Sequence, residues 1–139
     1  MFDLISSNPM IQAMDRSMTL ATRRTELIAS NLANIDTPGY RTQDFDFNEA
    51  LKTELARMDS QQTSLVRTHP QHMASTPGSS LPPTVDPVGP AYERNDGNDV
   101  SLDRESMLLA RTQQNYQLSS NFVQTELRKI TSMIREGSR

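Results

Sequence analysis

The sequence predicts a mainly α-helical protein of 139 residues, in which two long terminal helices form an antiparallel, coiled-coil-like pair. A short helix and an irregular proline-rich segment are predicted between them. Three observations predict this arrangement. Apolar residues recur at alternating spacings of three and four near both ends of the chain. Pro38-Gly39 interrupts the first of these patterns. Six of the eight prolines lie within residues 59–99, where they exclude a helix.

The first unit, residues 1–36, is predicted to form the N-terminal long helix. Pro9 suits the first turn of this helix, and one of the three polar residues before Pro9, Asn8 among them, can cap it. The apolar stripe then continues for more than six helical turns with Thr25 as its single polar member. A stripe of this period indicates packing against another long helix rather than an ordinary amphipathic surface. The predicted packing residues are Ile11, Met14, Met18, Ile28, Leu32 and Ile35.

A turn is predicted to end this helix. A residue that precedes proline is disfavoured in the α conformation, and proline has no N–H group to continue the helix. Glycine accepts the positive φ angle that the third residue of a type II turn requires. Asparagine and aspartate side chains can bond the backbone groups that become free at the helix end. The predicted turn residues are Asn31, Asn34, Asp36, Thr37, Pro38, Gly39 and Tyr40.

The second unit, residues 37–58, combines this turn with a short helix. Asp46, with Glu49 three residues later, gives an N-terminal capping signal. One apolar face follows, and a helix of about three turns needs a partner surface to persist. The residues of this face are Phe47, Leu51, Leu55 and Met58.

The third unit, residues 59–99, is rich in Pro, Ser, Thr and Gln and is predicted to be irregular. We interpret it as an extended arm that grips neighbouring subunits. The fourth unit, residues 100–139, is predicted to form the C-terminal long helix. Ser101 is its expected cap, and Asp103 and Glu105 favour the positive end of the helix. The predicted packing residues of its stripe include Leu109, Tyr116, Val123, Ile130 and Met133.

The composition argues against an enzyme, a metal site and a cofactor. The chain has no Cys, and its two histidines, His69 and His72, lie in a proline-rich stretch without a nearby fixed carboxylate. No glycine-rich phosphate loop is present, so no small-molecule substrate is expected. A net charge of −3 gives no reason to expect nucleic acid as a partner. The first residues lack the basic and continuous apolar regions of a secretory signal peptide.

Two separated stretches resemble the bacterial flagellar rod and hook proteins. "SNLANIDTPGY" at residues 30–40 resembles their N-terminal signature, and "RTQDFDFNEAL" at residues 41–51 resembles the short proximal rod subunits. "GNDVSLDRESMLLARTQQNYQ" at residues 97–117 is similar to the beginning of the C-terminal helix in the same subunits. The resemblance covers residues 30–51 and 97–134 and is absent from the middle of the chain.

This resemblance implies a structural subunit of the proximal rod of the flagellar basal body, which polymerises through its terminal helices to transmit torque. Such subunits are exported by the flagellar type III apparatus without a cleaved signal peptide and assemble in the periplasm. The implied partners are other copies of the chain, the rod proteins FlgC, FliE and FlgF-like proteins, and the export gate. Phe47 and Leu51 match the Phe-x-x-x-apolar spacing of a motif that the gate reads, although the same residues can form a helix face.

Two alternatives remain open at this point. One is another short rod protein, similar to FlgC, although the uninterrupted "DTPGYRTQDFDF" favours the proximal subunit. The other is a cytoplasmic coiled-coil adaptor or secretion chaperone, which would form a discrete oligomer and stay inside the cell. Hook and distal rod proteins need a larger middle domain than residues 59–99 provide.

Overall fold

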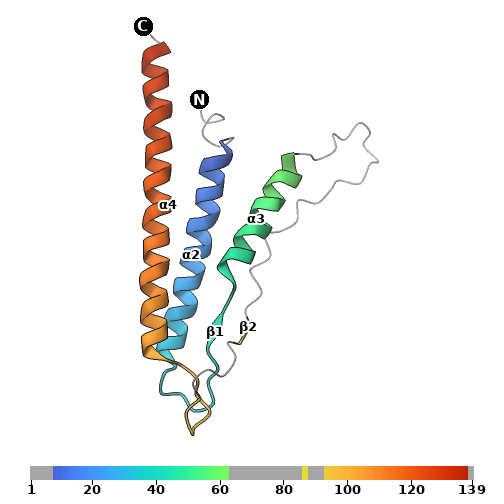
Figure 1. Cartoon of the computed structure of the whole chain (residues 1–139), viewed down its shortest axis with the longest axis vertical. Coiled ribbons are helices and arrows are strands. Elements are labelled where there is room, and N and C mark those ends of the chain that lie inside the picture. Colours follow the sequence, from blue (N-terminus) through green and yellow to red (C-terminus); the bar gives the residue numbers. More distant parts are fainter. Residues whose placement is uncertain (1–7, 63–85, 88–92, 138–139) are drawn as a thin grey trace, which may run out of the picture.

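The computed structural model describes residues 8–62, 86–87 and 93–137 of the chain, and these residues are mainly helical, as predicted (Figure 1). The elements in chain order are α2 (Pro9–Ala33), β1 (Gln43–Asp44), α3 (Phe47–Gln62), β2 (Asp86–Pro87) and α4 (Leu102–Gly137). Helices α2 and α4 are the long ones, with 25 and 36 residues.

Helix α2 begins at a side-chain cap and ends at a polar turn. The Asn8 side chain accepts hydrogen bonds from the backbone N–H groups of Met10, at 2.9 Å, and Ile11. Pro9 occupies the first turn, where its missing N–H group leaves no hydrogen bond unmade. The helix ends at Ala33, slightly before the predicted boundary at residue 36, because Asn34 already departs from helical backbone angles.

Helices α2 and α4 lie side by side and run in opposite directions (Figure 1). Ser17 near the start of α2 contacts Ser119, whereas Asn31 near its end contacts Glu105 at the start of α4. The seam between the two helices is unusually polar. Its buried residues are Ser17, Ala21, Ile28 and Asn31 on α2, and Glu105, Thr112 and Ser119 on α4.

Helix α3 packs on a different face of α2, away from α4 (Figure 1). Its cap is Asp46, whose carboxylate accepts hydrogen bonds from the backbone N–H groups of Asn48 and Glu49. The helix continues to Gln62, past the predicted end at residue 58. The small apolar core at this interface consists of Leu20, Leu27 and Phe45, with Phe47, Ala50 and Leu51 packed against it.

A short antiparallel ladder lies where the sequence predicted only irregular chain. Gln43 of β1 is paired with Pro87, and Asp44 with Asp86. Proline is found in edge strands, and both strands of this two-stranded ladder are edge strands. Most of the predicted arm at residues 59–99 lies outside the described residues.

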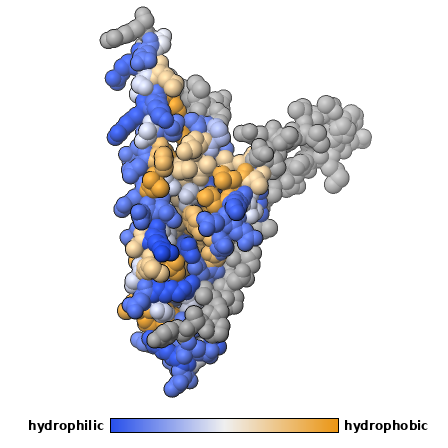
Figure 2. All heavy atoms as spheres, in the orientation of Figure 1, coloured by the Kyte–Doolittle hydropathy of each residue, from blue (hydrophilic) through white to orange (hydrophobic). Residues whose placement is uncertain are grey.

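Few apolar side chains of the described residues are buried in the single chain, and many reach its surface. The buried ones are Leu20, Ala21, Leu27, Ile28, Phe45 and Val100. Figure 2 shows apolar side chains at the surface of the face drawn, between hydrophilic stretches. Within the described parts of the chain, no helix has the length and apolar character needed to cross a membrane. The exposed large apolar residues on α4 are Leu102, Met107, Tyr116, Leu118, Phe122, Met133 and Ile134.

Candidate functional site

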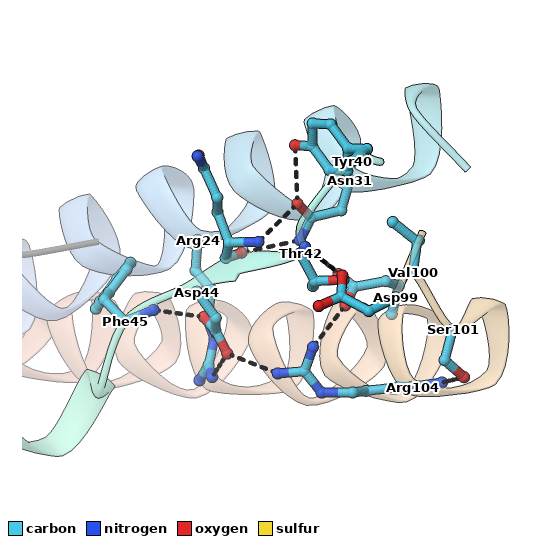
Figure 3. Close-up of polar contacts among 12 residues, drawn as sticks. Arg24, Asn31, Tyr40, Thr42, Asp44, Phe45, Asp99, Val100, Ser101 and Arg104 are labelled. Atoms are coloured by element: carbon cyan, nitrogen blue, oxygen red, sulfur yellow. Dashed lines mark hydrogen bonds and ion pairs between the residues drawn. The ribbon is translucent and has the colours of Figure 1, made fainter. Parts of the chain in front are cut away.

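The predicted turn residues gather where the end of α2, strand β1 and the start of α4 meet. We call this region the corner and define it as residues 31–45 and 93–105 (Figure 3). Its side chains are held by hydrogen bonds and ion pairs that join segments far apart in the sequence. Arg24 of α2 reaches the corner from one side.

Two glycine turns lie against each other at the corner. The N–H group of Tyr40 donates to the carbonyl of Thr37 at 3.3 Å, and Gly39 has a φ angle of +73°. That angle is what the third residue of a type II turn requires. Gly97 has a φ of +78°, and a Cβ atom added to it would lie 3.6 Å from the Cα atom of Gly39. The Gly39 N–H group donates to the Asp96 carbonyl at 2.9 Å, which ties the two turns together.

Asn31 is only 1% exposed, and its side chain forms four hydrogen bonds. Its Oδ1 atom accepts from the Tyr40 hydroxyl and from the Gln43 N–H group, both at 3.1 Å. Its Nδ2 atom donates to the Gln43 carbonyl at 2.9 Å and to Glu105 Oε2 at 3.2 Å. An amide side chain offers two donors and two acceptors, and here all four are used. Asn31 therefore links α2 to β1 and to α4 at once.

Asn34 and Thr37 bond locally, whereas Asp36 and Pro38 lie at the surface. Asn34 Nδ2 donates to the Ser30 carbonyl at 2.9 Å, and the Thr37 hydroxyl donates to Asn34 Oδ1 at 3.2 Å. The Asp36 side chain is 93% exposed and forms only a long ion pair with Arg94 at 3.8 Å. Pro38 is likewise exposed. Of the predicted turn residues, Asn31 is buried, Asn34 and Tyr40 are half-buried, and the others are exposed.

Asn98 is a buried member of the corner that sequence reasoning missed. Its Nδ2 atom lies 3.0 Å, 3.1 Å and 2.8 Å from the carbonyl oxygens of Asn34, Ile35 and Thr37. Its Oδ1 atom accepts from the Val100 N–H group at 2.8 Å. These carbonyls follow Ala33, the last residue of α2, so Asn98 holds the turn after the helix from a distant segment. Only its place between Gly97 and Asp99 before the C-terminal helix signalled such a role.

Asp99 fixes strand β1 from the same segment. Its Oδ1 atom accepts from both the N–H group and the hydroxyl group of Thr42, the latter at 2.8 Å. Its Oδ2 atom lies 3.7 Å from the Arg41 guanidinium. Burial alone would raise the pKa of Asp99, but the hydrogen bonds from Thr42 and the charge of Arg41 outweigh it and hold the pKa below its ordinary value. Asp99 is therefore ionised in the folded protein at neutral pH.

Two acids and two arginines form a charge cluster beside Asn31. The Arg24 guanidinium binds the Asp44 carboxylate through two hydrogen bonds, at 3.0 Å and 2.6 Å, and its plane lies over the Phe45 ring. Arg104 of α4 approaches the same Asp44 oxygen at 3.5 Å and binds Glu105 at 3.0 Å. Asp44 therefore bridges α2 and α4.

Glu105 is completely buried, although the sequence predicted only a favourable acid in the first turn of α4. Burial raises the pKa of its carboxyl group, and this effect exceeds the opposing effects of the Asn31 hydrogen bond and the Arg104 charge. The signal that locates Glu105 is its spacing. The alternation of three and four, extended from Leu109 toward the N-terminus, reaches residue 105 and places it on the seam.

The predicted packing residues occupy unequal positions in the single chain. Ile28 is buried, whereas Tyr116 and Met133 are 45% and 67% exposed. One partner helix covers only part of an apolar stripe, so residues on its flank stay at the surface. Phe47 and Leu51 are half-buried against the apolar core. The half-buried packing residues are Ile11, Met14, Met18, Leu32, Ile35, Leu109, Val123 and Ile130.

Within residues 8–62, 86–87 and 93–137, no three His, Cys, Asp or Glu side chains are grouped so that they could hold a metal ion. His69 and His72 lie outside the described residues. The hydrogen bonds and ion pairs of the corner hold together segments that are far apart in the sequence.

Comparison with known proteins finds that this chain is similar to flagellar basal body rod proteins. A family model described as "Flagella basal body rod protein" matches residues 15–41, which span most of α2 and the turn that follows it. The flagellar basal body rod protein FlgB of Proteus mirabilis is 30% identical over 123 residues, covering 87% of this chain and 90% of the relative. The FlgB protein of Escherichia coli K12 is 30% identical over 136 residues, covering 92% and 94%.

The chain belongs to the FlgB family of flagellar basal body rod proteins. The FlgB protein of Salmonella typhimurium gives a similar match, 30% identical and covering 92% of this chain. FlgB relatives align along most of their own length, so the shared region includes both terminal helices and not the turn alone. The family model itself ends at Arg41, directly after the Gly39 turn.

Proposed function

We propose that the chain is a structural subunit of the proximal rod of the bacterial flagellar basal body and has no enzymatic activity. It polymerises through its terminal helices and transmits torque along the rod. Membership in the FlgB family supports this role, since the relatives are named as flagellar basal body rod proteins. The four proposed units are the long helix at 1–36, the turn and short helix at 37–58, the arm at 59–99 and the long helix at 100–139.

The observation that carries this proposal is the apolar surface of α4. Leu118 is 55% exposed, Phe122 43% and Met133 67%. Burying a fully exposed side chain of this kind stabilises an assembly by about 1.5–3 kcal/mol, so covering the exposed part of each one contributes about half of that, and α4 offers several along its length. A helix that leaves so much apolar surface uncovered is well suited to pack beside helices of neighbouring subunits. The coiled-coil-like contact would then extend from the α2–α4 pair to adjacent copies.

The corner supports the same proposal because it fixes how the long helices relate to the rest of the chain. Asn31 and Asn98 hold the end of α2 against β1 and the start of α4. Residues 93–99, which follow the undescribed part of the arm, enter the corner. We assign to the arm contacts with neighbouring subunits. The partners that we propose are other copies of the chain, FlgC, FliE and FlgF-like rod proteins.

The protein is proposed to reach the periplasmic part of the basal body through the flagellar type III export apparatus, without a cleaved signal peptide. Phe47 and Leu51 are the proposed contact with the export gate. Both side chains pack against the core of the folded chain. The gate would therefore read them before the chain folds, after which they serve as a helix face.

A charge placed on the apolar surface of α4 tests the proposal. We expect Leu118→Asp with Phe122→Asp to prevent rod assembly in a strain that lacks the native gene, because two carboxylates would have to be buried between subunits. The matched control is Gln114→Asp with Gln117→Asp, which adds the same charge at exposed polar positions of the same helix. Normal rods and motility in the Leu118/Phe122 variant would contradict the proposal.

Cell fractionation of the same strains separates a rod subunit from a cytoplasmic adaptor or chaperone. A cytoplasmic coiled-coil adaptor or secretion chaperone would remain in the cytoplasm as a discrete oligomer, whereas a rod subunit is recovered with purified basal bodies. A FlgC-like rod protein would also be recovered there, but the FlgB relatives favour the FlgB position. Cell fractionation with an antibody to the chain gives this answer directly.

A further inference from the structure

Two pairs of buried polar side chains form hydrogen bonds between α2 and α4. The hydroxyl groups of Ser17 and Ser119 are 3.1 Å apart, and Asn31 Nδ2 donates to Glu105 Oε2 at 3.2 Å. All four residues are buried. The two members on each helix are 14 residues apart, so the two pairs define the same antiparallel register. A separation of 14 residues is close to four helical turns, which brings both pairs onto one seam.

We propose that these two pairs determine which helix α2 accepts and in which register. The surface of α2 is selective for a helix that carries a carboxylate at the level of Asn31 and a small hydroxyl side chain at the level of Ser17. The chain's own α4 meets both requirements. The inference concerns pairing within the folded chain, and it stands or falls independently of the proposed role in the rod.

The other residues of the seam give little register information. The buried Thr112 hydroxyl donates to the Leu108 carbonyl of its own helix at 2.8 Å. Ala21 and Ile28 on α2 are apolar, as are Leu109 and Val123 on α4, and apolar residues of this kind pack in more than one register. A buried polar residue differs because it needs a partner at one level only. A single buried polar pair is known to fix register in coiled coils at some cost in stability.

A shift of the helices by one heptad disrupts both pairs. If α4 slides by seven residues so that Glu126 faces Ser17, Glu105 lies beyond the end of α2. If α4 slides by seven residues the other way, so that Thr112 faces Ser17, Asn31 lies beyond the start of α4. Each shift leaves at least one buried polar group without its partner, which is unfavourable because the group has lost its water.

The same contacts reject other amphipathic helices. A helix with leucine at the level of Asn31 would leave one donor of its Nδ2 atom unpaired, since Glu105 is its partner on α4. A large side chain at the level of Ser17 would hold the helices apart, because Ser17 and Ser119 are buried in direct contact. Selectivity therefore combines hydrogen bonding at one level with small size at the other.

Disulfide cross-linking tests the proposal, because the chain has no cysteine of its own. In the purified full chain, Ser17→Cys with Ser119→Cys reports the observed register, and Ser17→Cys with Thr112→Cys reports a shift of one heptad. Both reporters remove the Ser17–Ser119 hydrogen bond, so they measure the contribution of the Asn31–Glu105 pair. These pairs are compared in three backgrounds: the native sequence, Asn31→Leu with Glu105→Leu, and the control Ala29→Leu with Gln114→Leu. The control adds two leucines at exposed positions away from the seam.

We expect the leucine pair at residues 31 and 105 to reduce the native-register cross-link by about 3- to 10-fold, which lies in the lower part of the range for coupled contacts. The shifted cross-link should rise in the same background, while the control should match the native sequence. Glu105→Gln keeps an oxygen that accepts from Asn31 and should retain the native register. An unchanged native-register yield in the leucine pair would overturn the proposal. If the variant with leucine at residues 31 and 105 loses its helical circular dichroism, the single substitution Glu105→Leu is tested instead. A reduced native-register cross-link then supports the proposal, and an unchanged one overturns it.

Discussion

Replacing Asn31 by alanine tests the corner most sharply within a single chain. The substitution removes four hydrogen bonds, two to the backbone of Gln43, one to Tyr40 and one to Glu105. A hydrogen bond contributes about 1 kcal/mol net, and a buried group left without a partner costs about 1–3 kcal/mol. We therefore expect the free energy of unfolding to fall by about 3–4 kcal/mol, a large part of the roughly 5–15 kcal/mol of an ordinary domain.

The assay is urea unfolding followed by circular dichroism at 222 nm. Asn121→Ala is the matched control, because Asn121 is an exposed asparagine of α4, and a surface change of this kind stays within about 0.5 kcal/mol. A double-mutant cycle with Glu105→Ala isolates the one contact between α2 and α4, for which we expect a coupling of about 1–3 kcal/mol. A loss below about 1 kcal/mol in Asn31→Ala would refute the view that this side chain holds the corner.

Three further predictions concern the turn and the two buried acids. Gly39→Val forces a β-branched residue to a φ of +73° and should lower the free energy of unfolding by about 1–3 kcal/mol. It should reduce rod assembly, measured by electron microscopy, and leave export intact, measured by a secretion assay. Normal rods would contradict this prediction. Glu105 has a raised pKa, so it contributes stability below the unfolded pKa of about 4.3 that is lost as pH rises through the folded pKa. Glu105→Gln should therefore lose this pH dependence in unfolding experiments between mild acid and neutrality, and an unaltered profile would argue against the burial of Glu105. Asp99 has a lowered pKa, so it contributes stability above about pH 3.9 that is lost as pH falls through the folded pKa. Asp99→Asn should destabilise the chain at pH 7 and become neutral near pH 2, and equal destabilisation at both values would show that charge is not the cause.

The elements whose signals are local were predictable from the sequence. Pro9 with a polar residue before it predicted the start of α2, and Asp46 predicted the cap of α3. The Pro38-Gly39 dipeptide predicted a turn that needs positive φ at glycine. In each case a few adjacent residues determine the backbone, so neighbouring sequence is sufficient.

Features that depend on distant segments were not predictable in the same way. Asn98 acts on the end of α2 from more than 60 residues away, and no local pattern indicates which carbonyls it will reach. Glu105 is an acid at the start of a helix, a place where most acids are exposed, so its burial follows only from the seam with α2. The pairing of β2 with β1 depends likewise on a contact between distant segments, in a stretch whose composition favours irregular structure.

The central claim, that the chain forms the base of the flagellar rod, is tested most directly by electron microscopy of basal bodies from a strain that lacks its gene. The account predicts membrane rings without a rod and loss of motility, with both restored when the gene is supplied. An intact rod and hook in the deletion strain would contradict it.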